Sequence, residues 1–139
     1  MIEAVLDASV ILKWFRGEGE RHLDAARSLR ATFESGELFV FAPPLLRLEI
    51  LNAAGRRWSW AEDALIELAE ALEELTFEFK EPQLADVARW TARGLTAYDA
   101  AYVALAESEA LRLITDDELI LSVAPQIGLE LTAAARNER

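Results

Sequence analysis

The feature that most constrains this fold is the alternation of short apolar segments with longer segments of helical periodicity. Ile2-Glu3-Ala4-Val5-Leu6 is short and largely apolar, and Asp7-Ala8-Ser9 follows it directly. Leu113-Ile114-Thr115 has the same character and ends in Asp116-Asp117. Strands that alternate with helices predict an α/β fold, here a three-layer α/β/α sandwich around a central, mainly parallel sheet.

The remaining elements follow from the spacing of apolar residues and from the helix-breaking residues between them. Further strands are expected at residues 39–41 and 76–80, with an edge strand at residues 129–131. Helices are expected from about Ser9, over residues 22–33, from Pro43-Pro44, over residues 65–75, 84–93 and 98–111, and from about Glu118. The chain has 139 residues and no repeat or low-complexity segment, so residues 1–139 are expected to form one domain.

Composition limits which compartments and which metals are plausible. No window approaches the roughly 18 consecutive apolar residues of a membrane span, and the N-terminus lacks the basic start of a signal peptide, so a cytoplasmic protein is expected. The chain has no cysteine, which excludes disulfides and thiolate metal sites. Any metal must be held by oxygen or by the single histidine, and this favours Mg²⁺ or Mn²⁺.

The net charge of −11 argues at first against a nucleic-acid partner, because phosphate binding usually depends on lysine and arginine. The charge is unevenly distributed, however, since six acids fall within residues 60–75. Lys13 and Lys80 are the only lysines, so 12 of the 14 basic residues are arginine. Arginine suits bidentate contacts to phosphate or to a partner's carboxylates, although such a bias also arises in GC-rich genomes.

Four segments carry acids in positions that suggest a shared site. Asp7 follows the first strand, Glu49 interrupts an apolar helix, Asp99 lies near a helix start, and Asp116-Asp117 follows a late strand. Each acid taken alone has an ordinary explanation as a helix cap or a partly exposed helical residue. In parallel sheets, however, ligands bind beyond the carboxyl ends of the strands. Capping alone does not explain all four acids in this order.

The sequence resembles PIN domains, and among them the toxin ribonucleases of VapBC toxin–antitoxin modules. The resemblance covers essentially the whole chain, and its most distinctive part is the third of its four segments. The matching segments are Val5-Leu6-Asp7-Ala8-Ser9, Leu48-Glu49-Ile50-Leu51-Asn52-Ala53, residues 95–106, which begin Leu95-Thr96-Ala97-Tyr98-Asp99, and residues 113–119, which begin Leu113-Ile114-Thr115-Asp116-Asp117.

The resemblance implies a PIN-like fold and a catalytic set formed by Asp7, Glu49, Asp99 and Asp117. Asp7, Asp99 and Asp117 would hold the metal, with Ser9 and Thr115 as supporting hydroxyls. Asp116 occupies a variable place in the family pattern, as a further ligand or as a solvent-facing acid. The implied activity is Mg²⁺-dependent (or Mn²⁺-dependent) endoribonuclease cleavage of structured RNA, such as tRNA or ribosomal RNA loops. A VapB-like antitoxin and a homodimer are the implied protein partners.

Charge repulsion gives an independent reason to expect a cation, because converging carboxylates raise one another's pKa unless a positive ion lies among them. A receiver-like signalling domain also places aspartates at strand ends. It needs a lysine after a late strand, and neither Lys13 nor Lys80 stands there. A non-catalytic PIN scaffold that binds RNA or protein is a further alternative, as is a DNA-directed PIN nuclease, for which the chain is short.

The aromatic residues and the histidine complete the set of candidates. Aromatic residues at helical spacing are more often core than base-stacking residues, so a core position is the favoured interpretation here. His22 is expected on a solvated helix without a catalytic role. The aromatic residues concerned are Trp14, Phe15, Trp58, Trp60 and Trp90.

Overall fold

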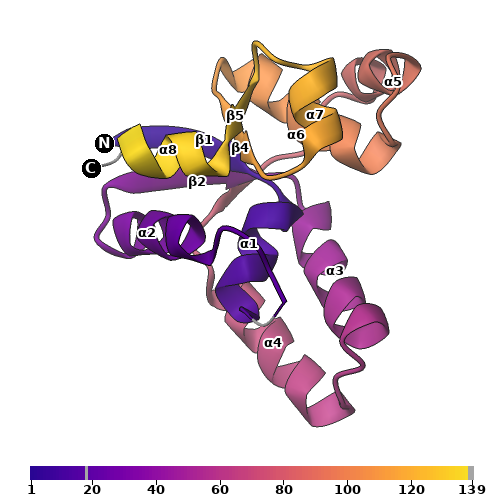
Figure 1. The fold of residues 1–139 in the computed structure, drawn as a ribbon. Coiled ribbons are helices and arrows are strands. Elements are labelled where there is room, and N and C mark those ends of the chain that lie inside the picture. Colours follow the sequence, from indigo (N-terminus) through magenta and orange to yellow (C-terminus); the bar gives the residue numbers. More distant parts are fainter. Residues whose placement is uncertain (18, 138–139) are drawn as a thin grey trace.

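The computed structural model describes residues 1–17 and 19–137 of the chain. A five-stranded, entirely parallel sheet with strand order β3-β2-β1-β4-β5 forms its centre. Figure 1 shows helices on both sides of this sheet, with α1 to α4 on one side and α5 and α6 on the other. The α/β/α sandwich expected from the alternating pattern is therefore confirmed.

The elements follow one another with short connections. The strands are β1 (Ile2–Leu6), β2 (Leu38–Ala42), β3 (Glu78–Phe79), β4 (Leu113–Thr115) and β5 (Gly128–Glu130). The helices are α1 (Ala8–Phe15), α2 (Leu23–Glu34), α3 (Leu45–Asn52), the π-helix η1 (Ala53–Arg57), α4 (Glu62–Glu74), α5 (Leu84–Ala92), α6 (Ala97–Glu109), α7 (Glu118–Val123) and α8 (Leu131–Asn137).

The order of the strands creates a switch point next to β1. The chain adds β2 and β3 on one side of β1, and β4 and β5 on the other. β1 pairs with β4 through Val5 with Leu113 and Leu6 with Ile114. The residues that follow β1 and β4 therefore leave the sheet side by side, at the place where open parallel sheets bind ligands.

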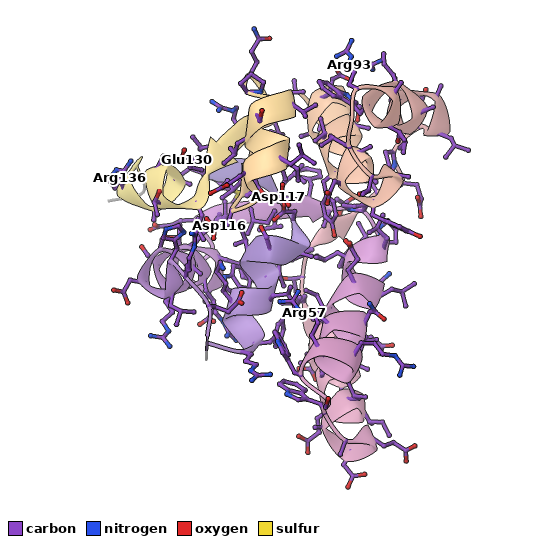
Figure 2. The ribbon with its side chains drawn as sticks, turned by 45° about the vertical axis from the view of Figure 1, so that its right-hand side comes forward. Arg57, Arg93, Asp116, Asp117, Glu130 and Arg136 are labelled. Atoms are coloured by element: carbon purple, nitrogen blue, oxygen red, sulfur yellow. The ribbon has the colours of Figure 1, made fainter. Side chains whose placement is uncertain are left out.

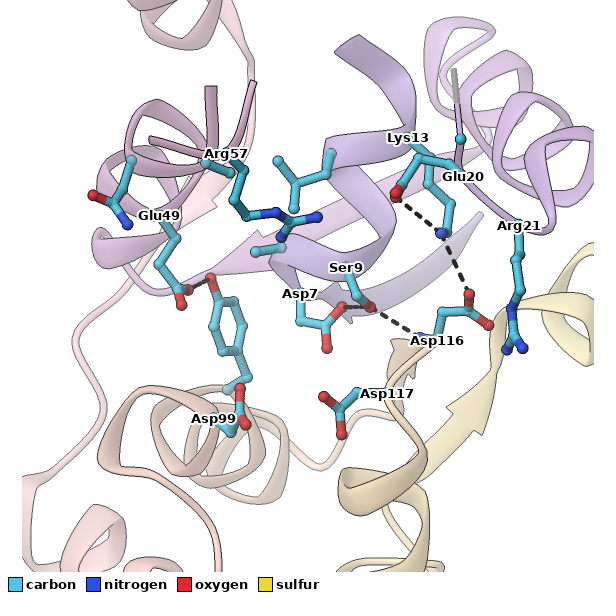
Figure 3. A pocket seen from close by; sticks show the side chains of 16 residues that line it. Asp7, Ser9, Lys13, Glu20, Arg21, Glu49, Arg57, Asp99, Asp116 and Asp117 are labelled. Carbon is cyan, nitrogen blue, oxygen red and sulfur yellow. Dashed lines mark hydrogen bonds and ion pairs between the residues drawn. The ribbon is translucent and has the colours of Figure 1, made fainter. Parts of the chain in front are cut away.

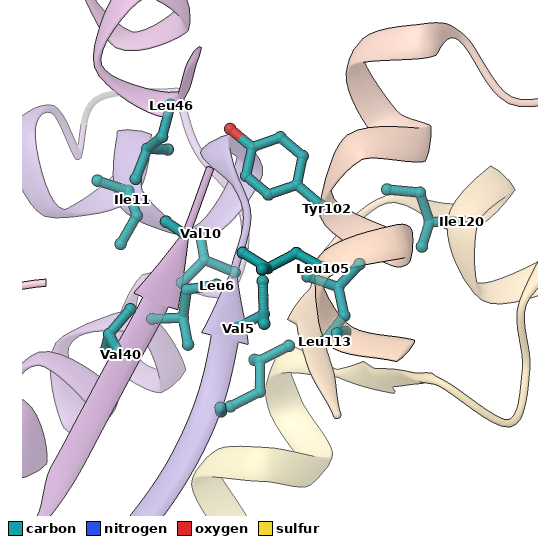
Figure 4. Close-up of a cluster of buried hydrophobic side chains, with 14 of the residues drawn as sticks. Val5, Leu6, Val10, Ile11, Val40, Leu46, Tyr102, Leu105, Leu113 and Ile120 are labelled. Atoms are coloured by element: carbon teal, nitrogen blue, oxygen red, sulfur yellow. The ribbon is translucent and has the colours of Figure 1, made fainter. Parts of the chain in front are cut away.

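The hydrophobic core fills the space between the sheet and the helices on both sides. Val5 and Leu6 of β1 are fully buried and lie among side chains from the flanking helices (Figure 4). Tyr102 of α6 is the largest fully buried side chain. Full burial of a side chain such as valine or leucine contributes about 2 kcal/mol to stability through removal from water. This packing therefore holds α1 and α6 firmly against β1.

Three elements differ from the sequence-based expectation near the ends of the sheet. The strand expected at residues 76–80 is reduced to Glu78–Phe79, an edge strand that pairs only with the end of β2. The strand expected at residues 129–131 begins one residue earlier, and Leu131 already belongs to α8. α8 was not expected; it is short, it contains the buried Ala134 and Ala135, and it packs against α2.

The segment after α3 is also different, because Gly55 does not end the helix as its residue type suggests. The backbone continues without interruption as the π-helix η1 and ends only at Arg57. π-helical turns inside helices are rare and occur frequently at functional sites.

The aromatic residues largely follow the favoured core interpretation. Trp14 and Trp90 are buried, while Phe15, Trp58 and Trp60 are partly buried against the core. His22 does not lie on a helix: it precedes α2 with a left-handed backbone (φ 58°). Among the described residues, no helix is long and apolar enough to cross a membrane.

Candidate active site

A pocket of about 500 Å³ opens at the carboxyl ends of β1 and β4 (Figure 3). It collects acids from segments that are far apart in the sequence. Its acidic lining residues are Asp7, Glu20, Glu49, Asp99, Asp116 and Asp117, and its basic ones are Lys13, Arg21 and Arg57. The structure thus brings all the acids expected to form the site into one pocket.

Asp7 lies at the bottom of this pocket with only 3% of its surface exposed. The hydroxyl of Ser9 donates to Oδ1 of Asp7 at 2.6 Å, and the hydroxyl of Thr115 donates to Oδ2 at 2.5 Å. Burial raises the pKa of Asp7 from the usual 3.8 to about 7, although both hydroxyls oppose the shift. The negative charges of Asp117 and Asp99 raise this pKa further, so the ionised form of Asp7 needs a compensating positive charge.

The two supporting hydroxyls also connect β4 to α1. The backbone N–H of Asp116 donates to the hydroxyl of Ser9, and that of Asp117 donates to Thr115, each at 3.0 Å. Each hydroxyl can therefore donate to Asp7 while it accepts from the backbone after β4. This fixes the orientation of Asp7 relative to both strand ends.

Asp99 and Asp117 were each open to explanation as helix caps, and the structure separates the two cases. The hydroxyl of Thr96, not the carboxylate of Asp99, caps α6 by accepting the Asp99 N–H at 3.1 Å. Oδ1 of Asp117 does cap α7, accepting the N–H of Ile120 at 2.9 Å. The carboxylate of Asp99 therefore has no capping role in α6. Burial and the charge of Asp117 raise the pKa of Asp99.

Glu49 enters the pocket from α3 and is held by a tyrosine on the opposite helix. The hydroxyl of Tyr102 donates to Oε1 of Glu49 at 2.5 Å, across a gap of 53 residues in the sequence. Burial raises the pKa of Glu49, and burial together with the charge of Glu49 raises the pKa of Tyr102. Tyr102 therefore remains a hydrogen-bond donor, which keeps α3 and α6 at a fixed separation across the pocket.

Asp116 is engaged in an ion-pair network at one side of the pocket. Its Oδ2 lies 3.4 Å from Nζ of Lys13, and its Oδ1 lies 2.8 Å from Nδ1 of His22. Nζ of the buried Lys13 also contacts Oε1 of Glu20 at 3.2 Å. Both oxygens of Asp116 thus contact basic side chains, so Asp116 is not a solvent-facing acid, and its part as a further ligand stays a prediction.

The Lys13 network gives a stability prediction with a control inside the chain. Lys13→Met leaves the half-buried carboxylates of Glu20 and Asp116 facing each other, and should lower the free energy of unfolding by about 3 kcal/mol. Lys80→Met removes the exposed ion pair with Glu109 and should cost less than about 1 kcal/mol. Urea denaturation measures both; equal losses would contradict a special role of Lys13.

The pocket is acidic, but as placed its acids do not form a closed cage. Within residues 1–17 and 19–137, no three histidine, cysteine, aspartate or glutamate side chains stand close enough to hold an ion together. The donors that Asp7, Asp99 and Asp117 offer are carboxylate oxygens, which suit hard cations. Mg²⁺ keeps several waters and takes one or two carboxylates, so an open arrangement of this kind fits it.

Several pocket residues were not identified from the sequence. A signal existed for Lys13, since it is the one charged residue in the otherwise apolar segment Val10-Ile11-Leu12-Lys13-Trp14. Arg57 had no such signal, because η1 brings it to the pocket and no sequence pattern indicated a π-helix. Figure 2 shows Arg57 at the opening shared with Asp116 and Asp117, whereas Arg93 and Arg136 lie elsewhere on the surface.

Comparison with known proteins identifies the family. The model of the PIN domain matches residues 4–125 of the chain, whereas no curated protein gives a significant match. The solved structures that match include the crystal structure of PAE2754 from Pyrobaculum aerophilum, at 25% sequence identity and a TM-score of 0.69 over 98% of this chain and 96% of that one. PIN domains are generally nucleases and commonly use a divalent metal. Because the family model spans most of the sequence, this chain belongs to the PIN domain family.

Proposed function

We propose that this PIN domain is a Mg²⁺-dependent or Mn²⁺-dependent endoribonuclease that hydrolyses phosphodiester bonds in unpaired regions of structured RNA. The observation that carries the proposal is the buried carboxylate of Asp7, which shares one pocket with Asp99 and Asp117. The charge of Asp117 raises the pKa of both Asp7 and Asp99, so bringing these three acids together costs folding free energy that a bound cation would offset. A metal-dependent nuclease needs such a bound cation for its reaction.

The cation would be held by Asp7, Asp99 and Asp117, directly or through water. When bound, a divalent cation lowers the pKa of water and offsets the negative charge that develops on a phosphodiester. It also removes the objection raised by the net charge of −11, because it places positive potential where the phosphate must bind.

The chain's own residues have distinct parts in this proposal. Ser9 and Thr115 hold Asp7 in a single orientation, so its carboxylate needs no rearrangement when a cation binds. Tyr102 occupies Oε1 of Glu49 and leaves Oε2 available to orient a water molecule or accept its proton. The exposed guanidinium group of Arg57, at the pocket wall, is placed to contact a phosphate oxygen.

The protein partners follow from the sequence resemblance to VapC-like toxins. A VapB-like antitoxin would block the pocket, and a homodimer would be the toxin's assembly. A tRNA or ribosomal RNA substrate would place the protein in the cytoplasm. A small upstream reading frame encoding a protein with a DNA-binding N-terminus is expected beside the gene, and purified product of that frame should inhibit cleavage. A gene without this neighbour would favour a solitary processing nuclease.

The activity itself is tested by incubating purified protein with a mixed pool of tRNA and ribosomal RNA. Discrete products are expected with Mg²⁺ or Mn²⁺ and none with EDTA, because cleavage requires the cation. Mapping the product ends then identifies the target. Uncut RNA from a folded protein that binds Mn²⁺ would contradict the nuclease proposal and favour a non-catalytic PIN scaffold. Cleavage of DNA in preference to RNA would contradict the substrate class.

A further inference from the structure

A second hollow, of about 890 Å³, lies directly beside the acidic pocket between α3, α4 and the start of α6. Glu49 and Asn52 line both hollows, so the two adjoin along one turn of α3. In contrast to the acidic pocket, the second hollow is mainly apolar. Its apolar residues are Leu45, Leu48, Leu51, Trp60, Leu65 and Tyr98. We call it the Tyr98 groove.

Two large side chains in the Tyr98 groove are unusually exposed. Tyr98 is 65% exposed and Leu48 is 69% exposed. Tyr98 directly precedes Asp99 on the first turn of α6, so the groove and the proposed cation site are lined by consecutive residues. Among the described residues, the Tyr98 ring is stacked on no other aromatic ring and its hydroxyl has no hydrogen-bond partner. A flat apolar surface is thus available to a ligand.

The charge around the Tyr98 groove differs from that of the acidic pocket. Arg56 lines the groove and Arg57, the next residue, lines the acidic pocket, so η1 supplies one guanidinium group to each hollow. Neither side chain forms an ion pair with another described residue. One arginine at each of two neighbouring hollows suits contacts to two phosphates of one bound strand, and the apolar surface of the groove suits a base.

We infer that the Tyr98 groove binds an unpaired RNA nucleotide next to the scissile phosphate, with its base stacked on Tyr98 and its phosphate at Arg56. This inference rests on the proposed nuclease function and adds a substrate-binding subsite to it. The position of the groove beside the acidic pocket favours a nucleotide over a second protein chain, because a strand cut at the cation site must extend from that site on one side or the other. Aromatic rings flanked by cations are the usual means of holding single strands.

The test measures binding and cleavage separately, with the same short single-stranded RNA of mixed sequence. In EDTA, Tyr98→Ala should weaken binding of the labelled RNA about tenfold, whereas Tyr98→Phe should bind within about twofold of wild type because stacking is retained. Leu84→Ala removes another exposed apolar side chain, 82% exposed and outside both hollows, and should bind as wild type does. With Mg²⁺, Tyr98→Ala should raise KM and leave kcat nearly unchanged.

The possible failures can be told apart. Equal binding by wild type, Tyr98→Ala and Tyr98→Phe, together with metal-dependent cleavage, would overturn the subsite and leave the nuclease proposal standing. Absence of cleavage by wild type, with binding that still depends on Tyr98, would support the subsite and overturn the nuclease. If Tyr98→Ala changes the oligomeric state in sedimentation and does not change RNA binding, the groove is a protein interface and the inference is wrong.

Discussion

Asp7→Asn is expected to reduce the rate of RNA cleavage by at least about 100-fold, because loss of a direct ligand should cost no less than loss of an outer partner. The asparagine side chain has nearly the same size, and its carbonyl oxygen can still accept a hydrogen bond from Ser9 or Thr115. The variant should therefore fold. The measurement is the single-turnover rate with saturating Mn²⁺, together with circular dichroism to confirm the fold.

A matched control for this variant is Asp63→Asn, which makes the same chemical change at an exposed position in the first turn of α4. It should cleave at the wild-type rate. If Asp7→Asn and Asp63→Asn both cleave as wild type does, the acidic pocket is not the site of the reaction. If both lose activity equally, the effect comes from net charge and not from the pocket.

The metal-free protein is expected to lose stability as the pH rises, and Asp7 should be the main cause. The folded protein keeps its Asp7 proton up to about pH 7, whereas the unfolded chain releases it near 3.8. Between these values the native state binds more protons, so the free energy of unfolding falls as the pH increases. The expected loss from Asp7 between about pH 5 and about pH 8 is about 3 kcal/mol. The raised pKa values of Asp99 and Glu49 act in the same direction.

Urea denaturation in EDTA at the two pH values measures this loss. Asp7→Asn has no group to titrate at this position, so its stability should change much less and should exceed that of wild type at the higher pH. Mn²⁺ should restore stability to wild type at the higher pH, because a ligand that binds only the folded state stabilises it. A wild-type protein equally stable at both pH values without metal would show that burial does not raise the pKa of Asp7 in the folded state.

The convergence of the acids could be predicted because it depends on strand ends. Asp7 follows β1 directly and Asp117 follows β4 after one residue, and the carboxyl ends of parallel strands meet at one edge of a sheet. The role of Asp116 could not be predicted in this way. Its partner His22 lies 94 residues away in the sequence, on a connection whose left-handed backbone no periodicity indicates. The sequence pattern distinguished Asp116 from Asp117, but it did not indicate that Lys13 and His22 are the partners of Asp116.

The features missed in the fold share a physical cause. α8 is a short helix whose stability comes from packing against α2, and local propensity carries little information about such contacts. Glycine often marks the end of a helix, but at Gly55 the backbone continues as η1, which places Arg57 at the pocket. In both places tertiary packing decides the backbone. The missed π-helix matters more, since it supplies one arginine to each hollow.

A cation held by Asp7, Asp99 and Asp117 is the proposed basis of ribonuclease activity in this pocket. The most direct test is to titrate Mn²⁺ into the single-turnover cleavage reaction, for wild type and Asp7→Asn in parallel. A cation site of this kind predicts that the wild-type rate rises with Mn²⁺ and saturates, and that the Asp7→Asn rate stays near background throughout. Wild-type cleavage that persists in EDTA, or an Asp7→Asn variant with the same titration curve as wild type, would contradict it.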